Sequence, residues 1–141
     1  QLHIHSLNSD QIPLQSRWIQ IITSEYASNS QNVIPKIDLD QADKFIRVGI
    51  TRTNYNALLA NALDEGKNFD ELTTGVGGFE LIDSLDRIIH TMQTALHHYQ
   101  ERLKYVGPDC GLAAWKPPEV AVELLRRTGI AFSKVKQDYA H

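Results

Sequence analysis

Four short apolar segments stand out along the chain, and they are separated by stretches in which apolar residues recur every three or four positions. The segments cover residues 2–5, 18–22, 45–50 and 104–106. They are mostly hydrophobic without a clean alternation of apolar and polar side chains, which is typical of parallel strands covered on both faces. The pattern therefore predicts four β-strands.

The first two intervening stretches predict short helices. One covers residues 38–45, after Pro35, and runs up to the third strand. The other follows Asn54, an N-cap residue type, and is expected to end at Gly66, because glycine adopts the left-handed conformation that closes many helices. Residues 64–78 are rich in glycine and polar residues, and we expect a flexible excursion there.

The strongest helical periodicity covers residues 79–103. It predicts one long helix with Asp83 on its wetter side and an apolar face made of Ile82, Leu85, Ile89, Met92, Leu96, Tyr99 and Leu103. A last helix is expected to start near Pro118, since proline suits the first turn. Gly129 weakens the middle of that helix, where a break is possible.

Strands that alternate with helices indicate βα units and a parallel sheet. A (β/α)8 barrel needs eight such units and about 250 residues, whereas this chain has 141. The predicted fold is therefore α/β, with residues 1–141 forming one partial barrel domain, the C-terminal half of a TIM-type barrel. Because the chain starts at Gln1, we expect a longer protein, with the N-terminal half-barrel on the same or another chain.

Composition argues against nucleic acid and membrane partners. The formal net charge is −3, so no basic excess is available to neutralise the phosphates of a nucleic acid. No apolar run is long enough to cross a bilayer. The single cysteine excludes an internal disulfide and suits a reducing compartment, so a cytoplasmic location is expected.

Metal-binding residue types follow three of the four predicted strands. His3 and His5 lie on one face of the first strand, Glu25 follows the second, and Cys110 follows the fourth. Carboxyl ends of parallel strands line a common mouth, so these side chains should converge. Two imidazoles, one carboxylate and one thiolate form a plausible tetrahedral zinc set. Taken singly, each residue also suits an ordinary surface or packing role.

Two further residues at these strand ends are candidates for catalysis. Asp109 precedes the cysteine and is either an acceptor that holds a metal-bound histidine or a turn residue after Pro108. Asn54 follows the third strand and would lie at the same mouth. A group of histidines in the long predicted helix is better explained as a solvated helix face: His90, His97 and His98.

The segment "YVGPDCGLAAW", residues 105–115, resembles the N-P-D-C-G-L segment of the cobalamin-independent methionine synthase family. The helical stretch before it, "LHIHS" at 2–6 and "IITSEYAS" at 21–28 also resemble that family. The resemblance implies a zinc site made of His3, His5, Glu25 and Cys110 at the end of a catalytic barrel. His5 stands where the family has a second cysteine, so the chain looks like a divergent member.

The resemblance also implies an activity. The family transfers a methyl group to a zinc-activated thiol, homocysteine, in methionine biosynthesis, and here the donor could be a folate, a corrinoid protein or a small molecule. Two alternatives stay open on the residues alone. An amidohydrolase-like zinc hydrolase would use Asp109 beside the His-x-His pair, and a half-barrel subunit could be purely structural.

Overall fold

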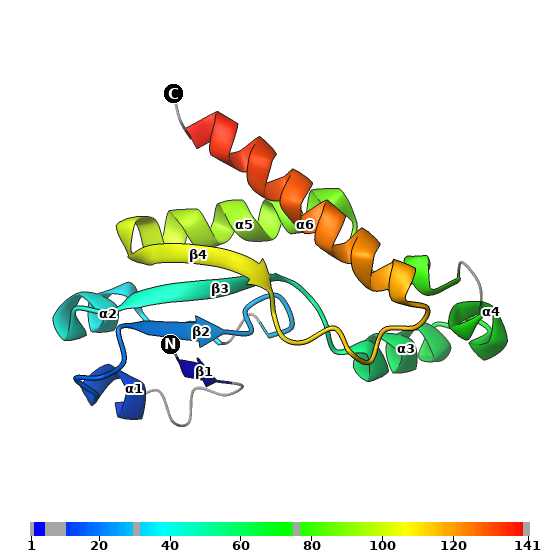
Figure 1. Ribbon diagram of the computed structural model, residues 1–141, viewed down its shortest axis with the longest axis horizontal. Coiled ribbons are helices and arrows are strands. Elements are labelled where there is room, and N and C mark those ends of the chain that lie inside the picture. Colours follow the sequence, from blue (N-terminus) through cyan, green and yellow to red (C-terminus); the bar gives the residue numbers. More distant parts are fainter. Residues whose placement is uncertain (1, 5–10, 30–31, 75–76, 140–141) are drawn as a thin grey trace.

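The computed structural model describes residues 2–4, 11–29, 32–74 and 77–139, and shows a parallel sheet with helices between its strands (Figure 1). The sheet has four strands in the order β1-β2-β3-β4. Their bounds are Leu2–Ile4, Ile21–Ser24, Phe45–Thr51 and Leu103–Pro108. All neighbouring pairs run parallel. The predicted α/β class with alternating βα units is therefore confirmed.

Six α-helices and two short 3-10 helices complete the described elements. The α-helices are α1 Gln11–Gln15, α2 Lys36–Ala42, α3 Tyr55–Asp64, α4 Phe69–Thr73, α5 Leu85–Tyr99 and α6 Pro118–Tyr139. The 3-10 helices are η2 Gly77–Glu80 and η3 Gln100–Arg102. In Figure 1, α5 and α6 lie beside β4, whereas α3 and α4 lie beyond the carboxyl ends of the strands. None of the described helices is both long and apolar enough to span a membrane.

The main core fills the space between one face of the sheet and the helices. Ile22, Ile46, Val48 and Ile50 alternate along β2 and β3 and are fully buried. They belong to a cluster with residues of α2, α5 and α6: Leu39, Ile88, Met92, Ala95, Tyr99, Ala131 and Val135. A second cluster lies under α3, α4 and the first half of α6, and it includes Trp115 and Leu124. The two clusters hold opposite ends of α6.

Local sequence signals place several helix ends correctly. The Asn54 side chain accepts a hydrogen bond from the Ala57 amide at 3.2 Å and caps α3. Gly66 follows that helix with a φ of 86°, the left-handed conformation that favours glycine. The break considered possible at Gly129 is absent: α6 continues through it with buried residues on both sides. Burial of an apolar stripe outweighs the cost of one exposed glycine, about 1 kcal/mol.

Two predicted boundaries were wrong. The second strand begins at Ile21 rather than at Trp18, whose side chain is 77% exposed. The helix expected over 79–103 is shorter at both ends, because Ser84 caps α5 and Leu103 already belongs to β4. The apolar periodicity extends beyond the helix because residues outside it, such as Ile82, are also buried.

The stretch expected as a flexible excursion, residues 64–78, contains helix α4. Asn68 caps it by accepting from the amides of Asp70 and Glu71, and Leu72 is only 2% exposed. Helix α1 was not predicted either. Both helices have five residues, too few for periodicity to reveal. His5 lies outside the residues that the structure describes.

Glu123 of α6 binds two arginines, and this contact makes the free energy of unfolding depend on pH. Its carboxylate accepts from Arg126 at 2.6 Å and from Arg127 at 2.9 Å. The hydrogen bonds from these two arginines lower the pKa of Glu123 from 4.5 to about 2. Because the folded pKa is depressed, the stabilisation is present above pH 4.5 and disappears as the pH falls toward 2.

We therefore predict that Glu123→Gln lowers the free energy of unfolding near neutral pH and that the difference from the native chain shrinks steadily below pH 4.5. Denaturant unfolding between pH 6 and pH 3 checks this. Glu119→Gln, on the same exposed first turns of α6, is the matched control. A difference for Glu123→Gln that stays constant with pH would contradict the prediction.

Candidate metal centre at the carboxyl ends of the strands

His3, Glu25 and Cys110 come together although they belong to three different parts of the chain. One ligand atom from each side chain lies within 4.8 Å of both others. The His3 Nε2 and Glu25 Oε1 atoms are 3.2 Å apart, and these side chains are 32% and 17% exposed. The convergence expected for these three residues is thus present. Their common position follows from the parallel sheet, which brings the ends of β1, β2 and β4 to one edge.

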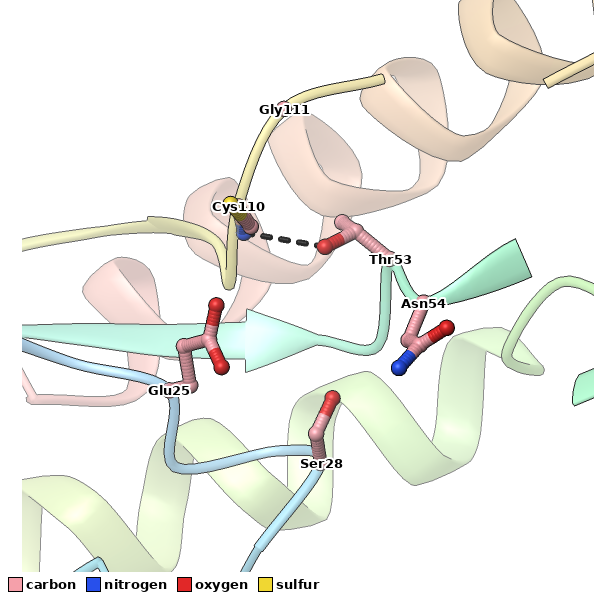
Figure 2. A pocket seen from close by; sticks show the side chains of 6 residues that line it. All are labelled: Glu25, Ser28, Thr53, Asn54, Cys110 and Gly111. Carbon is pink, nitrogen blue, oxygen red and sulfur yellow. Dashed lines mark hydrogen bonds between the residues drawn. The ribbon is translucent and has the colours of Figure 1, made fainter. Parts of the chain in front are cut away.

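The Cys110 loop is fixed by Thr53. The Cys110 amide donates to Thr53 Oγ1 at 2.9 Å (Figure 2), and the Trp115 indole donates to the Thr53 carbonyl at 3.3 Å. Thr53 is itself buried. A buried hydroxyl after β3 therefore positions the thiol after β4, while Figure 2 shows the Glu25 carboxylate pointing toward the same space.

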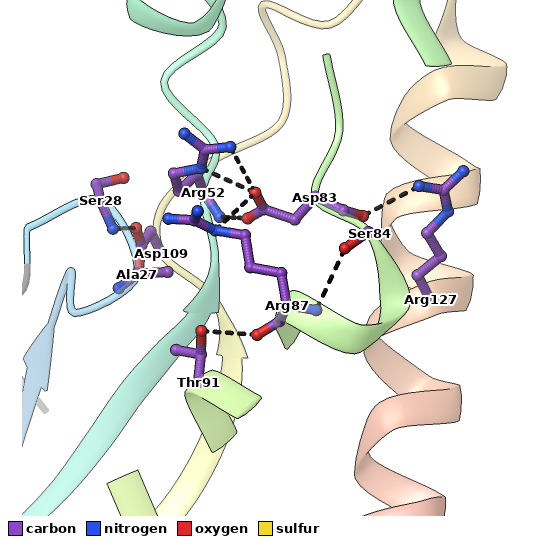
Figure 3. A network of polar contacts seen from close by, with 9 residues as sticks. All are labelled: Ala27, Ser28, Arg52, Asp83, Ser84, Arg87, Thr91, Asp109 and Arg127. Atoms are coloured by element: carbon purple, nitrogen blue, oxygen red, sulfur yellow. Dashed lines mark hydrogen bonds and ion pairs between the residues drawn. The ribbon is translucent and has the colours of Figure 1, made fainter. Parts of the chain in front are cut away.

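Asp109 fixes the loop that carries Glu25. Its carboxylate accepts from the Ala27 amide at 3.1 Å and from the Ser28 amide at 2.7 Å (Figure 3). Only 1% of Asp109 is exposed. Burial raises the pKa of this carboxyl, the two amides lower it, and the nearby Glu25 raises it further. Asp109 is therefore not a solvated turn residue: among the described residues its carboxylate holds the backbone beside Glu25.

A second buried carboxylate, Asp83, holds the end of β3. It accepts from the Arg52 amide and Nε, both at 2.8 Å, and pairs with Arg52 Nη2 at 2.7 Å and Arg87 Nε at 3.2 Å. Arg127 of α6 donates to the Asp83 carbonyl at 3.0 Å. Figure 3 shows this network beside the Asp109 contacts. The expectation that Asp83 lies on the wet side of a helix was wrong: the residue precedes α5 and is 3% exposed.

Two cavities flank Cys110. One, of about 230 Å³, is lined by Glu25, Ser28, Thr53, Asn54, Cys110 and Gly111 (Figure 2). Asn54 lies at this cavity as expected, but its Oδ1 already caps α3, so a capping role accounts for it. The other, of about 360 Å³, is lined by His3, Thr23, Arg47, Pro108, Asp109, Cys110 and Gly111.

The sequence reasoning missed Ser28, Thr23 and Arg47. Thr23 and Arg47 lie within predicted or adjoining strand segments, and their alternation with Ile22 and Ile46 would have placed them on the face opposite the core. Ser28 contributes its amide to Asp109, and no pattern in the sequence marks such a backbone contact.

The described ligand set suits a divalent metal by its chemistry. It offers one imidazole nitrogen, one carboxylate oxygen and one thiol sulfur, and Zn²⁺ binds all three donor types. The side chains are partly shielded: His3 and Glu25 are of intermediate burial, and Cys110 is exposed. These described side chains supply three of the four ligands that a tetrahedral zinc site takes.

Comparisons with protein-family models, with curated proteins and with solved structures found no match to this chain. The site geometry therefore carries the functional argument.

Gly49 is required for the Asp109 contacts. A Cβ atom at this position would lie 1.8 Å from Asp109 Oδ1 and 2.6 Å from Asp109 Cα. We predict that Gly49→Ala lowers the free energy of unfolding by about 1–3 kcal/mol, the usual cost of forcing atoms into a packed site. Thermal and denaturant unfolding measure this. In the control Gly129→Ala, the added Cβ meets nothing within 4 Å and should stabilise α6 by about 0.5–1 kcal/mol. Equal effects of both substitutions would contradict the packing argument.

Asp83→Asn should destabilise the chain by about 3 kcal/mol, because a buried carboxylate that accepts from Arg52 and Arg87 becomes a neutral amide whose NH2 group faces those donors. The matched control is Glu80→Gln, which breaks the exposed Lys67–Glu80 pair and should cost less than about 1 kcal/mol. Denaturant unfolding of both variants gives the comparison. A loss below 1 kcal/mol for Asp83→Asn would show that the network does not anchor the end of β3.

Proposed function

We propose that the chain is part of a zinc-dependent methyltransferase that transfers a methyl group to a homocysteine-like thiol. The observation that carries this proposal is the convergence of His3, Glu25 and Cys110 at one edge of the sheet. Residues 105–115 also resemble a segment of the methionine synthase family, which is the reason for choosing thiol methylation among zinc reactions. His5 is kept as a further ligand in the proposal on sequence grounds alone.

Each residue has a defined part in this proposal. His3 and Cys110 hold the metal through nitrogen and sulfur, and Glu25 is the oxygen ligand that a substrate thiol would displace. Asp109 keeps the Glu25 loop in place through two amides. When bound, zinc would hold a substrate thiol as thiolate at neutral pH, and the thiolate is the nucleophile in methyl transfer.

The position of Asp109 favours thiol chemistry over hydrolysis. A hydrolase of the amidohydrolase kind would need this carboxylate beside the metal, to bind it and activate water. Here both carboxylate oxygens already accept backbone amides. Cys110, by contrast, is part of the converging set. A sulfur ligand suits the binding of a second sulfur from a substrate.

We further propose that the chain forms the C-terminal half of a (β/α)8 barrel. The four parallel strands follow one another in sequence order with helices between them, and the candidate ligands lie at their carboxyl ends. A (β/α)8 barrel has this arrangement. In the described residues β4 lies at one edge of the sheet, so its outer backbone groups can pair with a further strand. The N-terminal half would lie on the same or another chain. A free cysteine is consistent with a cytoplasmic location.

Zinc binding tests the ligand set. We predict that the purified protein binds one zinc ion and that His3→Ala and Cys110→Ser each weaken binding by at least about 100-fold, since even the groups that merely orient ligands contribute 10- to 100-fold. Titration against a chromophoric chelator measures the affinity. His90→Ala removes an exposed histidine of α5 and is the control. Full zinc affinity in the Cys110→Ser variant would contradict the site.

X-ray absorption at the zinc edge then distinguishes methyl transfer to a thiol from hydrolysis. Adding homocysteine to the zinc-loaded protein should increase the number of sulfur neighbours of zinc by one. A zinc ion surrounded only by nitrogen and oxygen, before and after homocysteine, would refute thiol activation.

A further inference from the structure

A row of side chains crosses the face of the sheet that lies opposite the main core. His3 pairs with Thr23, Thr23 with Arg47, and Arg47 with Tyr105. Residues paired across neighbouring strands project from the same face. The row therefore runs from His3, a proposed metal ligand, to Arg47 two strands away, and the Cα atoms of these residues are about 10 Å apart across the sheet.

Arg47 differs from the other arginines of similar burial. Four arginines have intermediate exposure in the described residues: Arg47, Arg52, Arg102 and Arg127. The last three pair with Asp83, with Asp40 and Asp43, and with Glu123, respectively. In the described part of the chain, Arg47 has no carboxylate within ion-pair distance, and its Nη2 donates to the Pro108 carbonyl at 2.9 Å. A partly buried guanidinium has five N–H donors, so the described contact with a neutral carbonyl leaves donors for an anion.

Two neighbouring residues, Pro108 and Gly107, hold the Arg47 guanidinium in place. The hydrogen bond to Pro108 fixes one end of it. Gly107 makes the space, because a Cβ there would lie 2.6 Å from Arg47 Nη2. The same cavity of about 360 Å³ is lined by His3, Cys110 and Arg47. A small molecule that reaches the proposed metal ligands through its sulfur can therefore reach Arg47 with its other end.

We propose that Arg47 binds the carboxylate of the thiol substrate and makes the site selective for mercapto acids over neutral thiols. This inference rests on the proposed function and adds a specificity-determining residue to it. A guanidinium can bind both oxygens of a carboxylate at once. A neutral thiol of similar length would leave the guanidinium without that partner.

Cobalt-substituted protein provides the test, because a thiolate bound to Co²⁺ gives a near-ultraviolet absorption band. The native protein should bind 3-mercaptopropionate at least about 10-fold more tightly than 2-mercaptoethanol, the order of one charged hydrogen-bonded pair. In Arg47→Met this preference should fall about 10-fold, while the affinity for 2-mercaptoethanol changes less than about 2-fold. Comparing the preference in native and variant protein cancels the different pKa values of the two free thiols.

Two further variants test whether the preference depends on the position of the Arg47 guanidinium or only on net positive charge. Gly107→Ala keeps Arg47 but pushes its guanidinium aside, so it should also reduce the preference for the mercapto acid. Arg17→Gln removes an exposed charge before β2, at the amino end of that strand, and should leave the preference unchanged. An equal loss in Arg17→Gln would mean that net charge, not the Arg47 site, attracts the acid, and would overturn the inference.

The outcomes also distinguish this inference from the proposed function. If Co²⁺ and both thiols bind but the native protein shows no preference, the Arg47 inference fails and the thiol site stands. If propionate alone competes with the mercapto acid in native protein and not in Arg47→Met, the carboxylate site is supported directly. If Co²⁺ binds without a thiolate band from either thiol, the proposed function and the inference both fail.

Discussion

The buried Asp109 carboxylate connects two loops that are far apart in the sequence. It accepts from the amides of Ser28 and Ala27, which precede it by 81 and 82 residues. One of these loops carries Glu25 and the other carries Cys110, so the separation of the candidate ligands depends on these two hydrogen bonds. The arrangement needs a glycine at position 49, since any side chain there would occupy the place of the carboxylate. Burying this carboxyl costs desolvation free energy, and the two amide hydrogen bonds offset part of that cost while they fix the geometry of this edge of the sheet.

Asp83 has the same role on the neighbouring segment. It binds the Arg52 amide and side chain directly after β3, and its own carbonyl accepts from Arg127 of α6. Each of two strand ends is thus tied to a distant loop by a buried carboxylate. Loops fixed in this way keep polar groups at set distances, and such fixed loops at the carboxyl ends of parallel strands are where ligands bind in α/β folds.

The proposed chemistry uses the two faces of the sheet differently. Alternate residues of β2 and β3 on one face are aliphatic and fully buried against the helices. On the other face, the row formed by His3, Thr23, Arg47 and Tyr105 carries an imidazole and a guanidinium. A candidate metal ligand and the proposed anion-binding group thereby lie on one surface, and the period of two along a strand separates them from the core.

The sequence by itself determined the class of the fold, the sheet-forming segments and the capping residues Asn54 and Gly66, because these depend on periodicity and on local backbone preferences. It also indicated that His3, Glu25 and Cys110 converge, because the ends of parallel strands meet at one edge. It could not place Asp109, Asp83 or Arg47. Whether a carboxylate is solvated, bound to amides or paired with an arginine is decided by residues dozens of positions away. Only the tertiary structure decided that Asp109 and Asp83 are buried supports, and that Arg47 lies in the described structure without a carboxylate partner.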